Sequence, residues 1–245
     1  MNLMNKSIIQ DIKENIIVLF WPETCPFCQK VCKEGICTEC RERLEFLRIR
    51  EPRCMQCGKQ IRSMEKEYCY DCLHTHHYYD RGISLWLHRE PVNQSIYQFK
   101  YHNQRRYGTI YAQEILYWYK DVIVSWHPDV IMPVPLHFRR KRKRGYNQAR
   151  ILAELIGTGT GIAVDSRHLI RRKYTNPQKI LGHRQRKKNL KNAFAVKKDF
   201  VPVKTVLLID DIYTTGSTID AAAYVLKQRG VVNVYFLTIS IGQGY

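Results

Sequence analysis

The sequence predicts an α/β protein with a parallel sheet, preceded by a small cysteine-rich module. Apolar, partly β-branched runs alternate with amphipathic helical patterns through the last two thirds of the chain, as in a sheet covered by helices. One of these runs, Val206–Ile209, is wholly apolar and is followed by two aspartates, which is typical of a strand buried on both faces. All nine cysteines of the 245-residue chain lie in its first third.

Eight of these cysteines form four Cys-x-x-Cys pairs with short gaps between them. Each pair can hold two thiolates on one turn, and two pairs complete a tetrahedral zinc site with four cysteine ligands. We expect the pairs to combine in chain order, into one site from Cys25, Cys28, Cys37 and Cys40 and a second from Cys54, Cys57, Cys69 and Cys72. The alternatives are an interleaved pairing, a single metal ion, or free or redox-active thiols. Zinc would supply the folding energy of such a small ribbon.

The end of the cysteine-rich region marks a domain boundary. Residues 1–77 are expected to hold an N-terminal helix, over 5–20, and a double zinc ribbon, while residues 78–245 form a second domain. Cys32 stands outside the four pairs. Three histidines after Cys72 are interpreted as linker residues, with substitute metal ligation as the alternative: His74, His76 and His77.

The second domain contains the alternating elements. Strands are predicted at 78–86, 129–136, 168–172, 191–196, 206–209 and 231–239. Helices are predicted at 90–101, 104–124, 149–156 and 219–229, with a glycine-containing loop at 157–161. The segment 171–190 is polar, basic and poorly periodic, and a polar loop of this length in a compact domain is usually a lid or disordered.

The formal charge of +18 indicates a polyanionic partner, nucleic acid first and an anionic membrane second. The weaker interpretation is that the cations serve only solubility and small phosphate-rich ligands. No apolar run approaches the roughly 20 residues that span a bilayer, and no secretory signal is evident, so we expect a soluble cytoplasmic protein.

Two basic segments are candidates for nucleic-acid contact. Six consecutive cations run through Arg139, Arg140, Lys141, Arg142, Lys143 and Arg144, in a segment expected to be a loop. Upstream, cations are interleaved with Tyr97, Phe99, Tyr101, Tyr107 and Tyr111. Aromatic residues among cations can stack bases, although aromatics at helical spacing more often belong to a core.

The stretch after Ile209 combines two kinds of ligand chemistry. Asp210 and Asp211 are followed by the hydroxyl-rich turn Thr214, Thr215, Gly216, Ser217 and Thr218, and then by a helical pattern. A strand–turn–helix leaves backbone N–H groups and the positive helix end free for a phosphate monoester. Carboxylates suit ribose hydroxyls and Mg²⁺ instead. The alternative is a buried strand and a helix that Thr218 caps.

A second strand end precedes the basic run, at Pro133, Val134, Pro135 and Leu136. A proline-rigid turn beside cations would suit pyrophosphate, because guanidinium groups bind phosphate oxygens in pairs. The alternative is that the basic segment follows a nucleic-acid backbone, and long cationic side chains allow both.

The stretch from Val206 to Thr218 resembles the 5-phosphoribosyl-1-pyrophosphate (PRPP) motif of type I phosphoribosyltransferases. Nearly the whole chain resembles the ComF family of amidophosphoribosyltransferase-like proteins. The resemblance rests on the paired cysteines, Pro133–Leu136, Arg144-Gly145-Tyr146-Asn147-Gln148, Gln178, Leu181, Arg186, Asn189, Ala193, Phe194 and Ile209–Thr218.

This resemblance implies a zinc ribbon fused to a type I phosphoribosyltransferase fold, which is parallel-sheet and Rossmann-like, binding PRPP with Mg²⁺. Asp210 and Asp211 would hold the ribose diol and the metal and act in catalysis, and Thr214–Thr218 would bind the 5′-phosphate. Val134 and Pro135 would lie near pyrophosphate. The flexible catalytic loop would include Gln178, Arg184, Arg186 and Asn189.

The family also implies a role in natural transformation, where single-stranded DNA enters the cytoplasm. Expected partners are that DNA and a DNA-translocating helicase, with the protein in the cytoplasm or at the inner face of the cell membrane. The alternatives are phosphoribosyl transfer to an acceptor unrelated to competence, and PRPP sensing. Thr214 stands where many purine-salvage members have a general base, and only six residues follow Ile239, so we do not expect nucleobase salvage.

Overall fold

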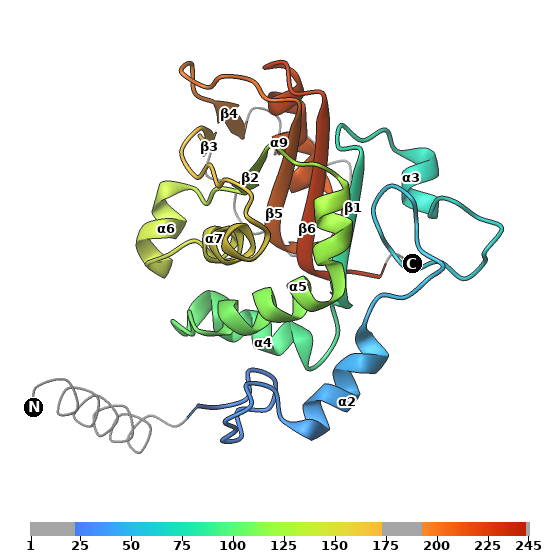
Figure 1. Cartoon of the computed structure of the whole chain (residues 1–245), viewed down its shortest axis with the longest axis vertical. Helices are drawn as coiled ribbons and strands as arrows, with labels where there is room; N and C mark the ends of the chain where they lie inside the picture. Colours follow the sequence, from blue (N-terminus) through green and yellow to red (C-terminus); the bar gives the residue numbers. More distant parts are fainter. Residues whose placement is uncertain (1–22, 173–192, 244–245) are drawn as a thin grey trace, which may run out of the picture. The chain divides into compact units, whose positions relative to one another are not determined.

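The computed structural model describes residues 23–172 and 193–243 (Figure 1). The chain forms two compact units, one ending at Phe46 and the other beginning at Leu47. The helix predicted over 5–20 lies outside the described residues. The boundary that we expected between residues 77 and 78 stays a prediction.

The first unit contains the first cysteine cluster and all but the last residue of helix α2 (Thr38–Leu47). The ligand atoms of Cys25, Cys28, Cys37 and Cys40 lie within 4.8 Å of one another. The second unit begins with the second cluster, in which the sulfurs of Cys54, Cys57, Cys69 and Cys72 are equally close, and helix α3 (Tyr70–His74) starts between its last two members. The pairing in chain order is therefore confirmed, and the interleaved pairing is wrong.

The second unit is built on a four-stranded sheet. Its strands are β1 (Arg81–Leu87), β2 (Val130–Pro133), β5 (Thr205–Tyr213) and β6 (Asn233–Ile241), in the order β1-β6-β5-β2. Every neighbouring pair is parallel, so all four carboxyl ends meet at one edge. The α/β class with a parallel sheet is confirmed.

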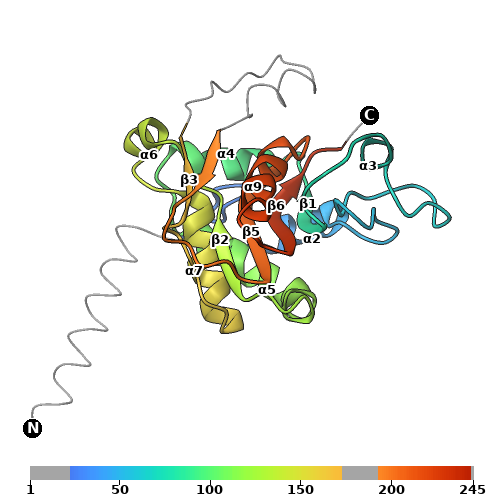
Figure 2. The same ribbon diagram turned by 90° about the horizontal axis from the view of Figure 1, so that it is seen from above.

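Helices cover both faces of this sheet (Figure 2). Helices α4 (Val92–Tyr101), α5 (Tyr107–Ser125) and α7 (Gln148–Thr160) are amphipathic, and α5 and α7 pack on each other. On the other face, apolar residues of α9 (Ser217–Lys227) share a core with Val206 and Leu208 of β5. The short strands β3 (Leu169–Arg171) and β4 (Phe194–Val196) form an antiparallel pair on either side of residues 173–192.

Two segments expected to be loops are helical. Helix α7 continues to Thr160 because its glycines allow close packing: a Cβ on Gly157 would lie 2.5 Å from a Val164 methyl, and one on Gly159 would lie 2.4 Å from Leu116. The basic run forms helix α6 (Phe138–Arg144), whose first turn is capped by the His137 side chain, which accepts a hydrogen bond from the Arg139 N–H.

Candidate functional site

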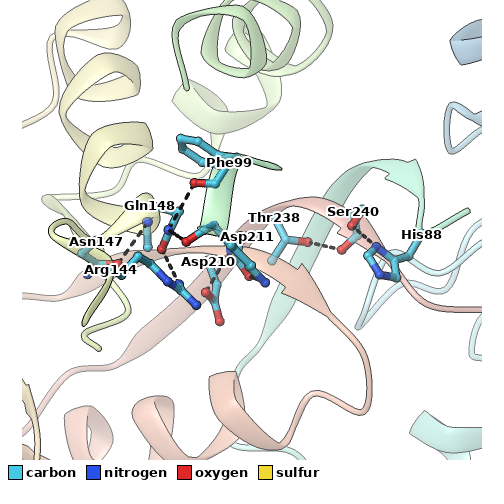
Figure 3. Close-up of polar contacts among 11 residues, drawn as sticks. His88, Phe99, Arg144, Asn147, Gln148, Asp210, Asp211, Thr238 and Ser240 are labelled. Carbon is cyan, nitrogen blue, oxygen red and sulfur yellow. Dashed lines mark hydrogen bonds and ion pairs between the residues drawn. The ribbon is translucent and has the colours of Figure 1, made fainter. Parts of the chain in front are cut away.

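The candidate site lies where β5 passes through the aspartate pair. The strand continues to Tyr213, although the sequence predicted that it ends at Ile209, because β6 runs alongside it as far as Ile241. Asp210 pairs in register with Thr238. Figure 3 shows Asp210 and Asp211 between Gln148 on one side and Thr238 on the other. The pair is therefore held by the sheet.

The turn after β5 has the local geometry of an anion-binding turn. Gly216 has a φ of +73°, and a Cβ there would lie 2.5 Å from the Tyr213 hydroxyl oxygen, so glycine is required on both counts. Helix α9 starts at the next residue, and within the described chain no side chain caps it. The alternative in which Thr218 is the cap is thus wrong. Hydroxyls of Thr215 and Ser217, 2.9 Å apart, flank the positive helix end.

The two carboxylates differ in their surroundings. An Asp211 oxygen lies 2.8 Å from the Lys100 ammonium, which comes from the last turn of α4. Burial, and then the negative charge of Asp211, raise the pKa of Asp210 to about 7. In the ligand-free protein the Asp210 charge is thus only partly formed at neutral pH. A bound cation, or hydroxyl groups donating hydrogen bonds, would favour its ionised form.

Two arginines outside the predicted PRPP site lie close enough to interact electrostatically, and one of them, Arg171, also acts on Asp210. Burial lowers the pKa of Arg171, at the end of β3, the positive charge of Arg140 lowers it further, and Asp210 acts in the opposite direction. Arg171 therefore adds positive charge next to Asp210, and Arg140 adds positive charge next to Arg171, a combination that suits an anion. The sequence analysis assigned Arg140 to nucleic acid and did not single out Arg171. Its place at the start of the long polar segment 171–190 was the available signal.

The junction of α6 and α7 ties the end of β2 to α4 (Figure 3). The Asn147 amide donates to the Val134 carbonyl at 3.0 Å, and its oxygen caps α7. The buried Gln148 donates to the Phe99 and Lys100 carbonyls and accepts from Arg144 at 2.6 Å. This motif therefore positions the segment that carries Lys100 beside Asp211.

The structure places Val134 and Pro135 at the end of β2, next to β5. The Val134 N–H donates to the Ile209 carbonyl at 2.8 Å, and proline has no N–H. Neither residue can therefore offer a backbone N–H to a phosphate. The loop residues Gln178, Arg184, Arg186 and Asn189 lie outside the described residues.

The cations of α6 divide into two groups. Arg140 and Arg144, one helical turn apart, are half-buried, and Arg144 lies 5.0 Å above the Tyr101 ring. The solvent-exposed group consists of Arg139, Lys141, Arg142 and Lys143. The upstream aromatics divide as well: Phe99, Tyr107 and Tyr111 are core residues, whereas Tyr97 and Tyr101 are 53% and 57% exposed.

Sequence reasoning also missed a row of polar side chains along the carboxyl edge. Ser84 and Thr238 hydroxyls are 2.6 Å apart, and the His88 Nδ1 lies 2.9 Å from the Ser240 hydroxyl. Burial lowers the pKa of His88, and the positive charge of Lys100 acts in the same direction. The signal was the presence of Thr238 and Ser240 in an otherwise apolar strand.

The cysteine clusters fit zinc. Each offers four sulfur donors and no other ligand type, which is the donor set of closed, structural sites. A family model, the double zinc ribbon domain, matches residues 16–73. The clusters therefore support structural zinc, with no position left for a substrate.

Comparisons with known proteins cover most of the chain. "Competence protein F" of Haemophilus influenzae is 30% identical over 88% of this chain and 95% of its own length. "Competence protein ComFC" of Bacillus subtilis is 24% identical over 93% and 88%. The glutamine PRPP amidotransferase of B. subtilis aligns in structure with a TM-score of 0.35 at 20% identity, covering 55% of this chain and 25% of that enzyme. By its identity to the Haemophilus protein over nearly that protein's full length, the chain belongs to the ComF family of competence proteins.

Proposed function

We propose that this chain is a DNA-uptake protein of natural transformation, with an α/β domain that binds PRPP together with Mg²⁺. The main support is one juxtaposition: Asp210 and Asp211 lie near the end of β5, and the short turn through Gly216 connects that strand to the uncapped start of α9. A sugar phosphate is a ligand that needs both hydroxyl-binding carboxylates and phosphate-binding amides. The names of its relatives support the role in DNA uptake.

In this proposal each part of the site has one task. Asp210 and Asp211 bind the ribose diol and Mg²⁺, and the turn Thr214–Thr218 binds the 5′-phosphate. The charges of Arg140 and Arg171 attract the pyrophosphate group beside Val134 and Pro135. Magnesium, when bound, would supply charge neutralisation between the phosphates and the carboxylates.

Calorimetry on the zinc-loaded full chain tests this proposal. PRPP should bind in the presence of Mg²⁺, and much more weakly when Mg²⁺ is omitted. Ribose 5-phosphate lacks the pyrophosphate group and should bind more weakly than PRPP, because the attraction of Arg140 and Arg171 is lost. Absence of binding at millimolar PRPP with Mg²⁺ would refute the proposal.

We further propose that single-stranded DNA binds the exposed cations of α6 and the exposed tyrosines of α4. Replacing Arg139, Lys141, Arg142 and Lys143 by glutamine should weaken binding and make it less dependent on salt. The slope of log affinity against log salt should become less negative by up to about 3, since each phosphate contact on a single strand contributes about 0.7. Fluorescence polarisation with an oligonucleotide at several salt concentrations measures both effects.

The control removes the same charge elsewhere, at four exposed cations: Lys33, Arg62, Lys66 and Lys120. An equal loss of affinity in this control would mean that only net charge matters. Unchanged affinity in the α6 variant would exclude this helix from the interface.

The tyrosines make a separate prediction. Tyr101→Ala should lower the affinity for single-stranded DNA about tenfold, because base stacking on an aromatic ring contributes about 1–3 kcal/mol. Tyr101 also lies under Arg144, so its loss removes a combined stacking and cationic contact. Tyr117→Ala, an exposed tyrosine of α5, is the matched control and should bind normally. Similar losses in both variants would contradict a specific platform.

The proposed location is the cytoplasm or the inner face of the cell membrane, with a DNA-translocating helicase as partner. No helix within the described residues is long and apolar enough to cross a membrane.

Phosphoribosyl transfer is a second candidate function. The observation that favours it is His88 at the same sheet edge, whose lowered pKa keeps its ring neutral and able to accept a proton in place of Thr214. Release of pyrophosphate from PRPP in the presence of single-stranded DNA would support it.

A further inference from the structure

The second cysteine cluster is embedded in the core of the α/β unit. Cys54 and Cys57 are 2% and 1% exposed, and they share one apolar cluster with Tyr213, Phe236 and the buried face of α9. A metal ribbon that served only as a surface attachment would not need this burial. The packing instead places the cluster in the same core as Tyr213, the residue directly before the turn that follows the aspartate pair.

Backbone contacts fix the second cluster against β1. Gly58 has a φ of +70°, and a Cβ there would lie 2.4 Å from the Gly82 carbonyl oxygen. The Gly82 N–H donates to the Gln56 carbonyl at 2.8 Å, and the Gln56 side chain donates to the Tyr79 carbonyl at 3.4 Å. A shift of the Cys54–Cys57 turn would therefore displace the start of β1 and Tyr79.

Tyr79 connects this position to the turn. Its hydroxyl lies 2.7 Å from the Tyr213 hydroxyl, and both rings pack on Phe236. The Tyr213 hydroxyl in turn occupies the space beside Gly216 that a Cβ would need. Moving the Tyr213 ring would thus change the conformation that the Gly216 turn can adopt.

The residues after Cys72 make a second connection, to the first turns of α9. The Tyr78 N–H donates to the Asp220 carboxylate at 2.6 Å, and the buried His77 ring lies 3.5 Å from the same oxygen. Because Cys72 is a cluster member, its position sets the start of the segment that carries both residues. The chain therefore contacts the turn and its helix from two sides.

We infer that Tyr79 and Tyr213 are positioning residues, through which metal binding at the second cluster sets the conformation of the Thr214–Thr218 turn. Four close thiolates repel one another unless a cation neutralises them. Loss of the metal would spread the cluster, and Tyr79 would no longer hold the Tyr213 hydroxyl. The first cluster lies in the other compact unit, and we assign it no such role. This inference rests on the proposed function only for what the turn binds.

Hydrogen exchange on the ligand-free full chain tests the inference without any ligand. Tyr213→Phe and Tyr79→Phe keep the rings and the metal but remove the hydroxyl contact, so exchange in the peptide covering 213–218 should be about fivefold faster in each. Tyr119→Phe, which removes another buried hydroxyl, one that donates to the Ser84 carbonyl, should leave this peptide unchanged. Unchanged exchange in both test variants would overturn the inference.

A pair of cysteine variants tests the role of the metal. Cys72→Ser and Cys37→Ser each replace a half-buried cluster member and should each lose one of the two bound zinc ions. Only Cys72→Ser should accelerate exchange in the 213–218 peptide. Equal exchange in the two variants, with the zinc loss verified by metal analysis, would contradict the inference. If Cys72→Ser does not fold, the tyrosine variants decide alone. A failure of PRPP to bind would refute the proposed function and leave these results unaffected.

Discussion

Replacing Asp210 and Asp211 together by asparagine is expected to lower the affinity for PRPP with Mg²⁺ by about a hundredfold or more. Hydrogen bonds to charged groups contribute about 1.5–3 kcal/mol each, and the double variant removes two carboxylates from the same ligand. It also removes the negative charge that would attract Mg²⁺. Calorimetry of the double variant against the unmodified chain measures the loss.

The loss of binding should occur without a loss of folding. The pKa of Asp210 is raised in the folded chain to about 7, from an ordinary value of 3.8. Between these two values the folded state binds more protons than the unfolded state, so this group makes the ligand-free chain less stable as the pH rises from about 4 to 7. Asparagine is neutral at every pH and removes this effect. Asp210→Asn should therefore unfold at the same temperature or higher at pH 8, in buffer without Mg²⁺.

Asp211→Asn should behave differently, because it leaves Lys100 without its partner at 2.8 Å. A small decrease in thermal stability is expected from this variant alone. Asp121→Asn, at an exposed position on α5, controls for the change in net charge and should bind PRPP normally. If the double variant and the Asp121→Asn control both keep the affinity of the unmodified chain for PRPP, then PRPP binds elsewhere.

Local sequence patterns predicted the secondary structure of most of the α/β unit. The alternation of apolar runs and helical patterns placed the four parallel strands within a few residues, because burial on both faces leaves a continuous apolar signal. The spacing of the cysteines likewise predicted both clusters, since the ligands of each site are close along the chain. These features depend on neighbours in sequence.

The prediction was wrong wherever a distant neighbour decided the conformation. The glycines at 157 and 159 read as a loop, but Val164 and Leu116 pack where their side chains would be. β5 continues past the aspartates only because β6 lies beside it. The same limit applies to the candidate site: Asp210 and Thr214–Thr218 are adjacent in sequence and could be predicted together. Lys100, which contacts Asp211, and Arg171, which acts on Asp210, come from other elements and could not.

Removing the metal from the second cluster is expected to destabilise the α/β unit far more than removing it from the first. Structural zinc contributes roughly 10–16 kcal/mol of apparent binding energy in small peptides, which is comparable to the roughly 5–15 kcal/mol that stabilises a typical domain. The second cluster shares its core with Tyr213, Phe236 and α9, so the cost of losing the metal falls on the whole unit. The first cluster belongs to a separate compact unit, and its loss should remain local.

Cys57→Ser and Cys25→Ser form a matched pair, because the two side chains are 1% and 0% exposed in their clusters. Cys57→Ser should lower the midpoint of the main thermal transition by at least about 10 °C, since roughly 1 kcal/mol shifts the midpoint by about 2–4 °C in a domain of this size. Cys25→Ser should lose the same amount of zinc and keep that midpoint within about 2 °C, which on the same scale is under about 1 kcal/mol. Calorimetric scans with metal analysis measure both. Equal shifts in the two variants would mean that the ribbons stabilise the chain together, and that the second cluster has no special place in the core behind the aspartate pair.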